Sequence, residues 1–317
     1  GHLENDMSSN RQHSYLILGG STKCGTTSVF NYLEFHPQIC PCTMKESRYF
    51  WYDTYPVLAA GRSADKSAGF DSLFNCKNDD ALRLEATPDY LYAIESAKAI
   101  KKSLADVRFL FILREPIDRL RSWYKFARMN GLLDATLSFS QYIEMQKSGS
   151  DKSTPQHLRA LEQGLYFSFL QPYIDMFGSD KIKVLFYEDL ASDPKAFCAG
   201  ICEFVQIDTG YFNDFSFRIF NPSVAAKNVK LHTMFRKMKR TVRPFTRMFG
   251  DNIRKKLKLA GYKAGKAFTN ANEASEEVAL DLTSGHLQWI ENYYLKDKEK
   301  LKSYLGTDLP WKDSPRK

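Results

Sequence analysis

The stretch that decides the fold is Tyr15-Leu16-Ile17-Leu18-Gly19-Gly20-Ser21-Thr22-Lys23-Cys24-Gly25-Thr26-Thr27-Ser28. Its first four residues are an apolar run that ends at two glycines, which predicts a buried strand entering a turn. From Thr26 to His36, apolar residues recur at helical spacing, and Pro37 stops the pattern, so we expect a helix there. The residues between are a glycine-containing loop that joins a strand to a helix.

This loop is an expected anion-binding site. Backbone N–H groups at the start of a helix attract anions, and the helix dipole adds to the attraction. Hydroxyl donors follow in the first turn, and Lys23 adds a mobile positive charge. The loop is not the GxxxxGK[ST] loop of nucleoside triphosphate-binding proteins, because no lysine follows Gly25. The alternative interpretation is a polar helix cap after a turn.

Two further apolar runs predict buried strands, at 107–113 and 182–187. Pro116 is expected in the first turn of a helix that runs to Gly131, and another helical pattern covers 158–177. Alternation of strands and helices indicates an α/β fold, a P-loop-like central parallel sheet flanked by helices. Ligands of such sheets bind at the carboxyl ends of the strands.

A second cluster, Arg114-Glu115-Pro116-Ile117-Asp118-Arg119-Leu120-Arg121-Ser122, follows the predicted strand 107–113. Arg114 ends that strand, and Ser122 lies two turns into the next helix. The guanidinium fork suits a phosphate, and a serine offers one further donor. The alternative for Arg114 is a surface ion pair. Arg119 and Arg121 are expected to face other sides of the helix.

Together the two clusters resemble the cofactor motifs of sulfotransferases that use 3′-phosphoadenosine 5′-phosphosulfate (PAPS). Residues 23–28 resemble the 5′-phosphosulfate loop, and the run 109–122 resembles the 3′-phosphate motif. Lys45-Glu46-Ser47-Arg48-Tyr49-Phe50 is similar to the family's KE-x-x-[FY]-F stretch, and 85–91 is similar to its E-x-[ST]-P-x-Y segment.

The resemblance implies the sulfotransferase fold and transfer of a sulfuryl group from PAPS to a hydroxyl acceptor, less readily to an amine. The product would be adenosine 3′,5′-diphosphate (PAP), and no metal is implied. Lys23 would balance charge on the leaving group, Glu46 would be the general base, and Lys45, with Arg48, would bind the sulfuryl oxygens. The alternative for Glu46 is a solvated loop acid. The implied cofactor-binding residues are Lys23, Cys24, Gly25, Thr26, Thr27, Ser28, Arg114 and Ser122.

The chain departs from the family in two places. It has neither the RKGxxG loop of the cytosolic animal enzymes nor the cysteine-bracketed loop of the Golgi heparan enzymes, so it looks closer to bacterial-type, single-domain members. The resemblance therefore does not identify the residues that cover the adenosine. Arg218, Asn221 and Lys227 are candidates. The acceptor is expected to be a small molecule, a carrier-bound chain or a glycan.

The net charge of +8 is concentrated in one segment. Residues 227–266 hold 14 Lys/Arg and one acid, Asp251, so they carry +13 and the rest carries −5. Such local basicity calls for a local explanation and not for a general affinity for nucleic acid, and no specific nucleic-acid partner is expected. Three interpretations stay open: an amphipathic helix pair packed on the domain, a lid or docking element for an anionic partner, or contact with a membrane surface.

The two termini and the cysteines bear on domain boundaries and on the cellular location. Residues 1–13 are interpreted as a tag remnant and flexible N-terminus, and 14–317 as a single sulfotransferase domain. No apolar run approaches the roughly 18 residues that a membrane span needs, and the polar start predicts no signal peptide. The six cysteines form no zinc pattern and indicate a reducing compartment. We therefore expect a cytoplasmic location, with a truncated Golgi-lumenal domain as the alternative.

Two other classes of function compete. A P-loop-type kinase is disfavoured by the missing lysine after Gly25 and by the absence of a clear magnesium-binding acid after a strand. A polybasic module that binds membranes or polyanions without catalysis would depend on 227–266 alone.

Overall fold

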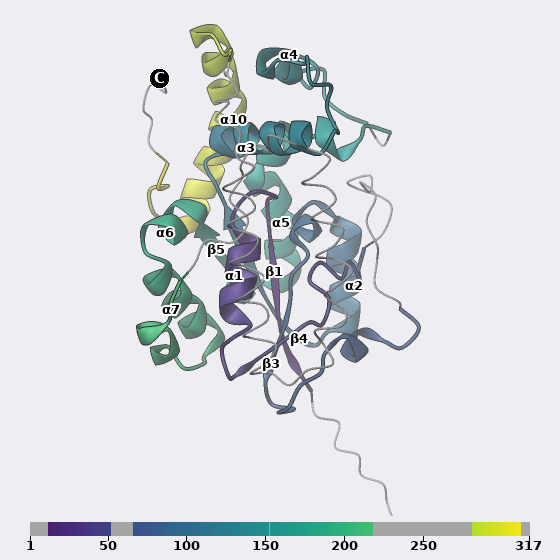
Figure 1. Ribbon diagram of the computed structural model, residues 1–317, viewed down its shortest axis with the longest axis vertical. Helices are drawn as coiled ribbons and strands as arrows, with labels where there is room; N and C mark the ends of the chain where they lie inside the picture. The colour runs from purple at the N-terminus through teal and green to yellow at the C-terminus, as the bar shows by residue number, and fades with distance from the viewer. Residues whose placement is uncertain (1–11, 52–65, 152, 218–280, 312–317) are drawn as a thin grey trace, which may run out of the picture.

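The computed structural model describes residues 12–51, 66–151, 153–217 and 281–311. Its centre is a five-stranded parallel sheet in the order β2-β3-β1-β4-β5 (Figure 1). This confirms the predicted parallel sheet flanked by helices. The strands are β1 (Ser14–Gly20), β2 (Ile39–Pro41), β3 (Leu82–Glu85), β4 (Asp106–Leu113) and β5 (Ile182–Phe186).

Helices cover both faces of the sheet (Figure 1). The apolar side chains of α1 (Thr26–Leu33) and α7 (Pro194–Val205) pack on one face. Those of α2 (Ile94–Ser103) and α5 (Tyr166–Phe177) pack on the other. Successive residues of a strand point to opposite faces, and the two central strands β1 and β4 are mostly apolar because both faces of the sheet are buried.

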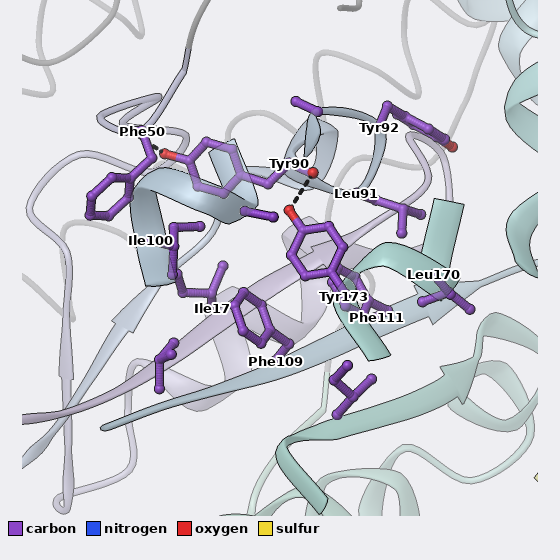
Figure 2. Packing of buried hydrophobic residues seen from close by; sticks show 14 of the residues in the cluster. Ile17, Phe50, Tyr90, Leu91, Tyr92, Ile100, Phe109, Phe111, Leu170 and Tyr173 are labelled. Carbon is purple, nitrogen blue, oxygen red and sulfur yellow. Dashed lines mark hydrogen bonds between the residues drawn. The ribbon is translucent and has the colours of Figure 1, made fainter. Parts of the chain in front are cut away.

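One face is rich in aromatic side chains (Figure 2). Phe109 of β4 meets Tyr173 of α5 edge-on, with ring centroids 5.1 Å apart. The Tyr173 hydroxyl donates to the Tyr90 carbonyl at 2.5 Å. Burial of each such ring stabilises the fold by roughly 1.5–3 kcal/mol. This packing holds the short 3₁₀ helix η2 (Pro88–Tyr92) against the sheet, and η2 in turn carries residues of the site.

A third apolar cluster lies beyond the carboxyl ends of the strands. It joins α3 (Pro116–Met129), α4 (Phe139–Glu144) and α10 (Ser284–Leu305). Figure 1 shows these helices together at one end of the molecule. α6 (Tyr187–Ser192) follows β5 directly.

The predicted helix over 158–177 is wrong in its first part. Two 3₁₀ turns, η3 (Gln156–Leu158) and η4 (Glu162–Gly164), precede α5. The Ala160 carbonyl accepts a hydrogen bond from the Arg119 guanidinium at 2.7 Å, and a side chain that takes over a helical acceptor interrupts the helix. The helix predicted over 26–36 likewise ends earlier, at Leu33.

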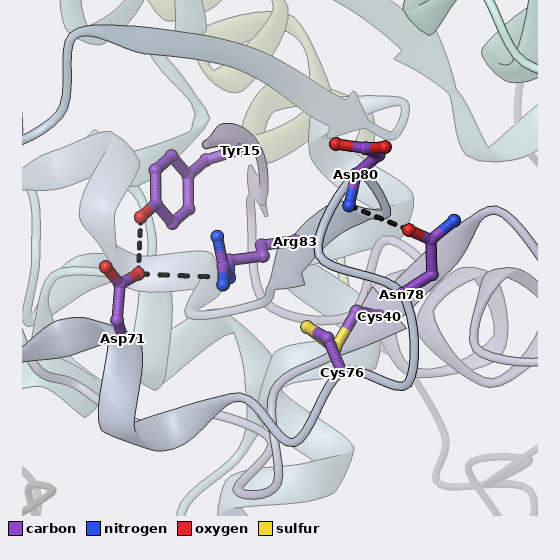
Figure 3. Close-up of a disulfide and its surroundings, with 7 residues drawn as sticks. All are labelled: Tyr15, Cys40, Asp71, Cys76, Asn78, Asp80 and Arg83. Carbon is purple, nitrogen blue, oxygen red and sulfur yellow. Dashed lines mark hydrogen bonds and ion pairs between the residues drawn. A yellow bond between two sulfur atoms is a disulfide. The ribbon is translucent and has the colours of Figure 1, made fainter. Parts of the chain in front are cut away.

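Cys40 and Cys76 form a disulfide between β2 and the loop before β3 (Figure 3). Their Cα atoms are 5.4 Å apart, although 36 positions separate them in the sequence. Disulfides persist in oxidising surroundings, so this bond speaks against the expected reducing compartment, and the location stays a prediction. Sequence reasoning missed the pair because β2 is too short to be recognised from its pattern. The other cysteines remain buried thiols: Cys24, Cys42, Cys198 and Cys202.

Candidate active site

The predicted anion-binding loop lies at the carboxyl end of β1. Three of its backbone angles are left-handed or otherwise positive, with φ of 130° at Gly20, 73° at Lys23 and 84° at Gly25. A Cβ atom on Gly20 would lie 2.4 Å from the Ile112 carbonyl oxygen, and one on Gly25 would lie 2.8 Å from Leu190 Cδ2. Only glycine fits these two positions without a shift of the neighbours. The loop is thus built by close packing against β4 and α6.

The start of α1 has no side-chain cap, because its N-cap residue is Gly25. Such a helix start suits an anion. Thr27 is partly exposed there, whereas Thr26 and Ser28 are buried, at 6% and 7% exposure. These residues lie where the sequence placed them, in the first turn.

Cys24 shapes the loop and offers no donor to a ligand. Its side chain is fully buried, and its backbone N–H donates to the Ser21 carbonyl at 3.2 Å. Burial raises the pKa of its thiol to about 12, with the charges of Arg119 and Arg114 partly offsetting the rise. The thiol is therefore neutral, and the predicted contact between Cys24 and the cofactor has no support in this geometry.

The structure brings the two sequence clusters together. Arg114 leaves β4 beside the loop, and its Nη1 donates to the Lys23 carbonyl at 3.3 Å. Its guanidinium lies over the Tyr187 ring, 4.5 Å from the centroid. The Lys23 ammonium lies 4.5 Å from the centroid of Phe126, which is one helical turn beyond Ser122 on α3. Lys23 and Arg114 therefore lie together at the carboxyl edge of the sheet, and Ser122 lies on α3 one turn before Phe126.

Glu46 lies in a tight turn after β2. Both Glu46 and Arg48 have positive φ, 57° and 51°, which for residues with side chains is uncommon and occurs often at functional sites. Lys45 Nζ donates to Glu46 Oε1 at 2.6 Å, and the two side chains are 11% and 40% exposed. The Glu46 carboxylate is thus accessible and held beside a cation.

The turn that carries Glu46 is bonded to the segment after β3. The Glu46 N–H donates to the Ala86 carbonyl at 2.8 Å, and the Arg48 N–H donates to Thr87 Oγ1 at 3.2 Å. Further along, the Tyr92 hydroxyl donates to Ser21 Oγ of the anion loop at 2.6 Å. The segment 85–92 therefore bridges Glu46 and the anion loop.

Two buried carboxylates in this bridge escaped the sequence reasoning. Burial raises the pKa of Glu85 to about 7, with hydrogen bonds from Thr87 and Ser47 opposing the rise. Burial, with the nearby charge of Glu46, raises the pKa of Asp89 to about 6. Gln156 Nε2 donates to Asp89 Oδ1 at 3.1 Å. Their only sequence signal was the E-x-T-P-D spacing directly after a strand.

Other predicted features fall outside the described residues. The adenosine-covering candidates Arg218, Asn221 and Lys227 do so, as does the basic segment 227–266. Within the described ranges, no group of three or more His, Cys, Asp or Glu side chains could hold a metal ion. No helix in those ranges is both long and apolar enough to cross a membrane.

Comparisons with known proteins identify the family and the fold. The family model described as "Sulfotransferase domain" matches residues 14–255. The bifunctional heparan sulfate N-deacetylase/N-sulfotransferase 3 of Homo sapiens is 26% identical over 207 residues, covering 62% of this chain and 22% of that protein. The membrane-associated sulfotransferase kil1 of Dictyostelium discoideum is 33% identical over 111 residues, covering 35% of this chain and 22% of that protein. The chain thus spans about a fifth of the length of these curated relatives.

Among solved structures, a sulfotransferase from Alicyclobacillus acidocaldarius aligns with a TM-score of 0.64 at 19% identity. The alignment covers 94% of this chain and 98% of that one, so the two share a fold. The narrower expectation of a bacterial-type member stays a prediction.

Proposed function

Because the chain belongs to the sulfotransferase family, we propose that it transfers a sulfuryl group from PAPS to a hydroxyl acceptor. The observation that carries the proposal is the meeting of the loop at 20–25 with Arg114, joined by the hydrogen bond from Arg114 to the Lys23 carbonyl. A lysine after Gly25, which a P-loop kinase would need, is missing, and Thr26 stands there instead.

The residues fit a donor with two anionic ends. The glycine-capped start of α1 and Lys23 suit the 5′-phosphosulfate. Arg114, whose guanidinium is a rigid two-donor fork, suits the 3′-phosphate. Gly20 and Gly25 keep the loop clear of side chains where the backbone must approach an anion.

In the proposed reaction the acceptor oxygen forms a bond to sulfur while the bond from sulfur to the bridging oxygen breaks. PAP leaves with the bridging oxygen and its electron pair. Lys23 stabilises the negative charge that grows on this oxygen, and Glu46 accepts the acceptor's proton. Lys45, bonded to Glu46, holds the base and faces the sulfuryl oxygens together with Arg48. Positioning and electrostatics therefore supply the catalysis, as in phosphoryl transfer.

An amine acceptor is the second candidate. The curated relative with 26% identity is named an N-sulfotransferase, and Glu46 could accept a proton from an amine as well as from an alcohol. The acceptor itself would be a small molecule, a carrier-bound chain or a glycan. The Cys40–Cys76 disulfide favours an oxidising compartment such as the Golgi lumen over the cytoplasm.

Nucleotide binding tests the donor. We expect the chain to bind PAP more tightly than adenosine 5′-phosphate or ATP with magnesium. Arg114→Ala should weaken the binding of PAP by about 1.5–3 kcal/mol, roughly ten- to hundred-fold in the dissociation constant, because one charge-assisted contact is lost. Adenosine 5′-phosphate, which lacks the 3′-phosphate, should change little. Calorimetric titration of both nucleotides measures this, and Arg108→Ala on the same strand is the control. Equal weakening of both nucleotides, or tighter binding of ATP with magnesium, would contradict the proposal.

A further inference from the structure

Arg119 is the largest fully buried side chain of the described residues. It lies on α3, between Arg114 and Ser122 in sequence. Its Nη1 donates to the Ala160 carbonyl at 2.7 Å, and its Nη2 donates to Gln163 Oε1 at 3.2 Å. Its Nε has no hydrogen-bond partner. Both acceptors are neutral, and the buried carboxylate of Asp89, whose pKa Arg119 helps to lower, is not among its hydrogen-bond partners.

No carboxylate of the described residues forms an ion pair with Arg119. A buried charge without an ion-pair partner costs several kcal/mol relative to water. A chain that keeps such a charge has a compensating interaction elsewhere or in another state. The hydrogen bonds to Ala160 and Gln163 satisfy two donors but leave the net charge in place.

The charge lies directly behind the anion loop. The backbone carbonyl oxygen of Gln163, whose side chain accepts from Arg119, lies 3.0 Å from the Tyr92 hydroxyl oxygen. That hydroxyl donates to Ser21 Oγ at 2.6 Å, and Ser21, Tyr92 and Gln163 are all buried. The guanidinium is also close enough to the Cys24 thiol of the loop to favour its anionic form. Protein and not water separates Arg119 from the loop, so its field there is weakly screened.

We propose that Arg119 is a positioning residue for the donor: its buried guanidinium, tied to the anion loop by the contacts of Gln163, Tyr92 and Ser21, places a positive charge behind that loop, and the 5′-phosphosulfate of the bound donor is a counter-charge to it. The inference rests on the proposed function. It adds a third positive charge to those of Lys23 and Arg114, one that never touches the ligand.

Gln163→Glu is the decisive variant. It keeps the size of the side chain and places a carboxylate beside the Arg119 fork. It also removes Gln163 Nε2, a buried nitrogen without a partner. We therefore expect an unchanged or higher melting temperature. Because the new carboxylate neutralises the Arg119 charge inside the protein, we also expect roughly ten- to thirty-fold weaker binding of PAP. Gln288→Glu, on an exposed position of α10, adds the same formal charge and should leave PAP binding unchanged.

The readout separates the electrostatic role from a structural one. Calorimetric titration with PAP and thermal unfolding are measured on the same preparations. A Gln163→Glu protein that is as stable as wild type and binds PAP as tightly would overturn the inference. If that variant melts at a lower temperature, a comparison of Arg119→Lys with Arg119→Met tests the electrostatic role. Both variants lose the two-donor guanidinium, and only lysine keeps the positive charge. Tighter PAP binding by Arg119→Lys supports the inference, and equal binding by the two overturns it. Failure of wild type to bind PAP would instead overturn the proposed function.

Discussion

At the scale of residues, backbone geometry at a few positions decides what the site can hold. Gly20 and Gly25 are required by contacts that a Cβ atom would violate, and this could be anticipated from a strand, two glycines and a helix start. The accessible Glu46 sits in a turn with positive φ, which no sequence pattern announced. Its identity as a base came from resemblance alone, so it needs its own test.

Glu46→Gln should leave PAP affinity unchanged and lower kcat by about 10²–10⁴-fold. The amide keeps the size of the side chain and an acceptor oxygen for Lys45, but it takes no proton at neutral pH. Steady-state turnover on an aliphatic alcohol, with PAP titration beside it, measures the two effects separately. Glu203→Gln, exposed on α7, is the matched control. A loss below about threefold would remove Glu46 as the base, and a parallel loss of PAP binding would show that it organises the turn.

At the scale of elements, the long apolar strands and the helices beside them were predictable because their patterns are strong. The short strands β2 and β3 were not, since each has four residues or fewer and cannot be told from a loop by its pattern. The helix predicted over 158–177 failed for a tertiary reason: Arg119, far away in sequence, takes the Ala160 carbonyl as a hydrogen-bond acceptor. Local pattern contains no information about such a partner.

The Cys40–Cys76 disulfide is also an element-scale feature, because it closes the stretch that carries Lys45, Glu46 and Arg48. Cys76→Ser should lower the free energy of unfolding by about 2–4 kcal/mol, chiefly because the unfolded chain gains freedom. Urea denaturation with and without reductant measures the loss. Reductant should bring wild type down to the level of the variant and leave the variant unchanged. Equal stability of wild type in both conditions would show that the bond does not form in solution.

At the scale of the whole molecule, the parallel sheet gathers segments that are far apart in sequence. The loop after β1, the turn after β2, the bridge after β3 and the residue after β4 all leave the same edge of the sheet. That convergence follows from parallel topology, so the meeting of Lys23 with Arg114 could be predicted. The buried polar chain from Arg119 to Ser21 could not, because it depends on side-chain packing between η2, η4 and α3.

The most direct test of the account is release of PAP from PAPS in the presence of an acceptor, compared between wild type and Lys23→Ala. Wild type should convert PAPS to PAP with sulfation of the acceptor, detected by intact mass. Lys23→Ala should keep its fold and lose at least about 10²-fold in kcat, because charge on the leaving oxygen is no longer stabilised. Lys125 is exposed on α3, next in sequence to Phe126, whose ring Lys23 contacts. The control variant Lys125→Ala should turn over as wild type does. Absence of PAPS turnover by wild type across hydroxyl and amine acceptors, or a near-normal kcat for Lys23→Ala, would contradict the account.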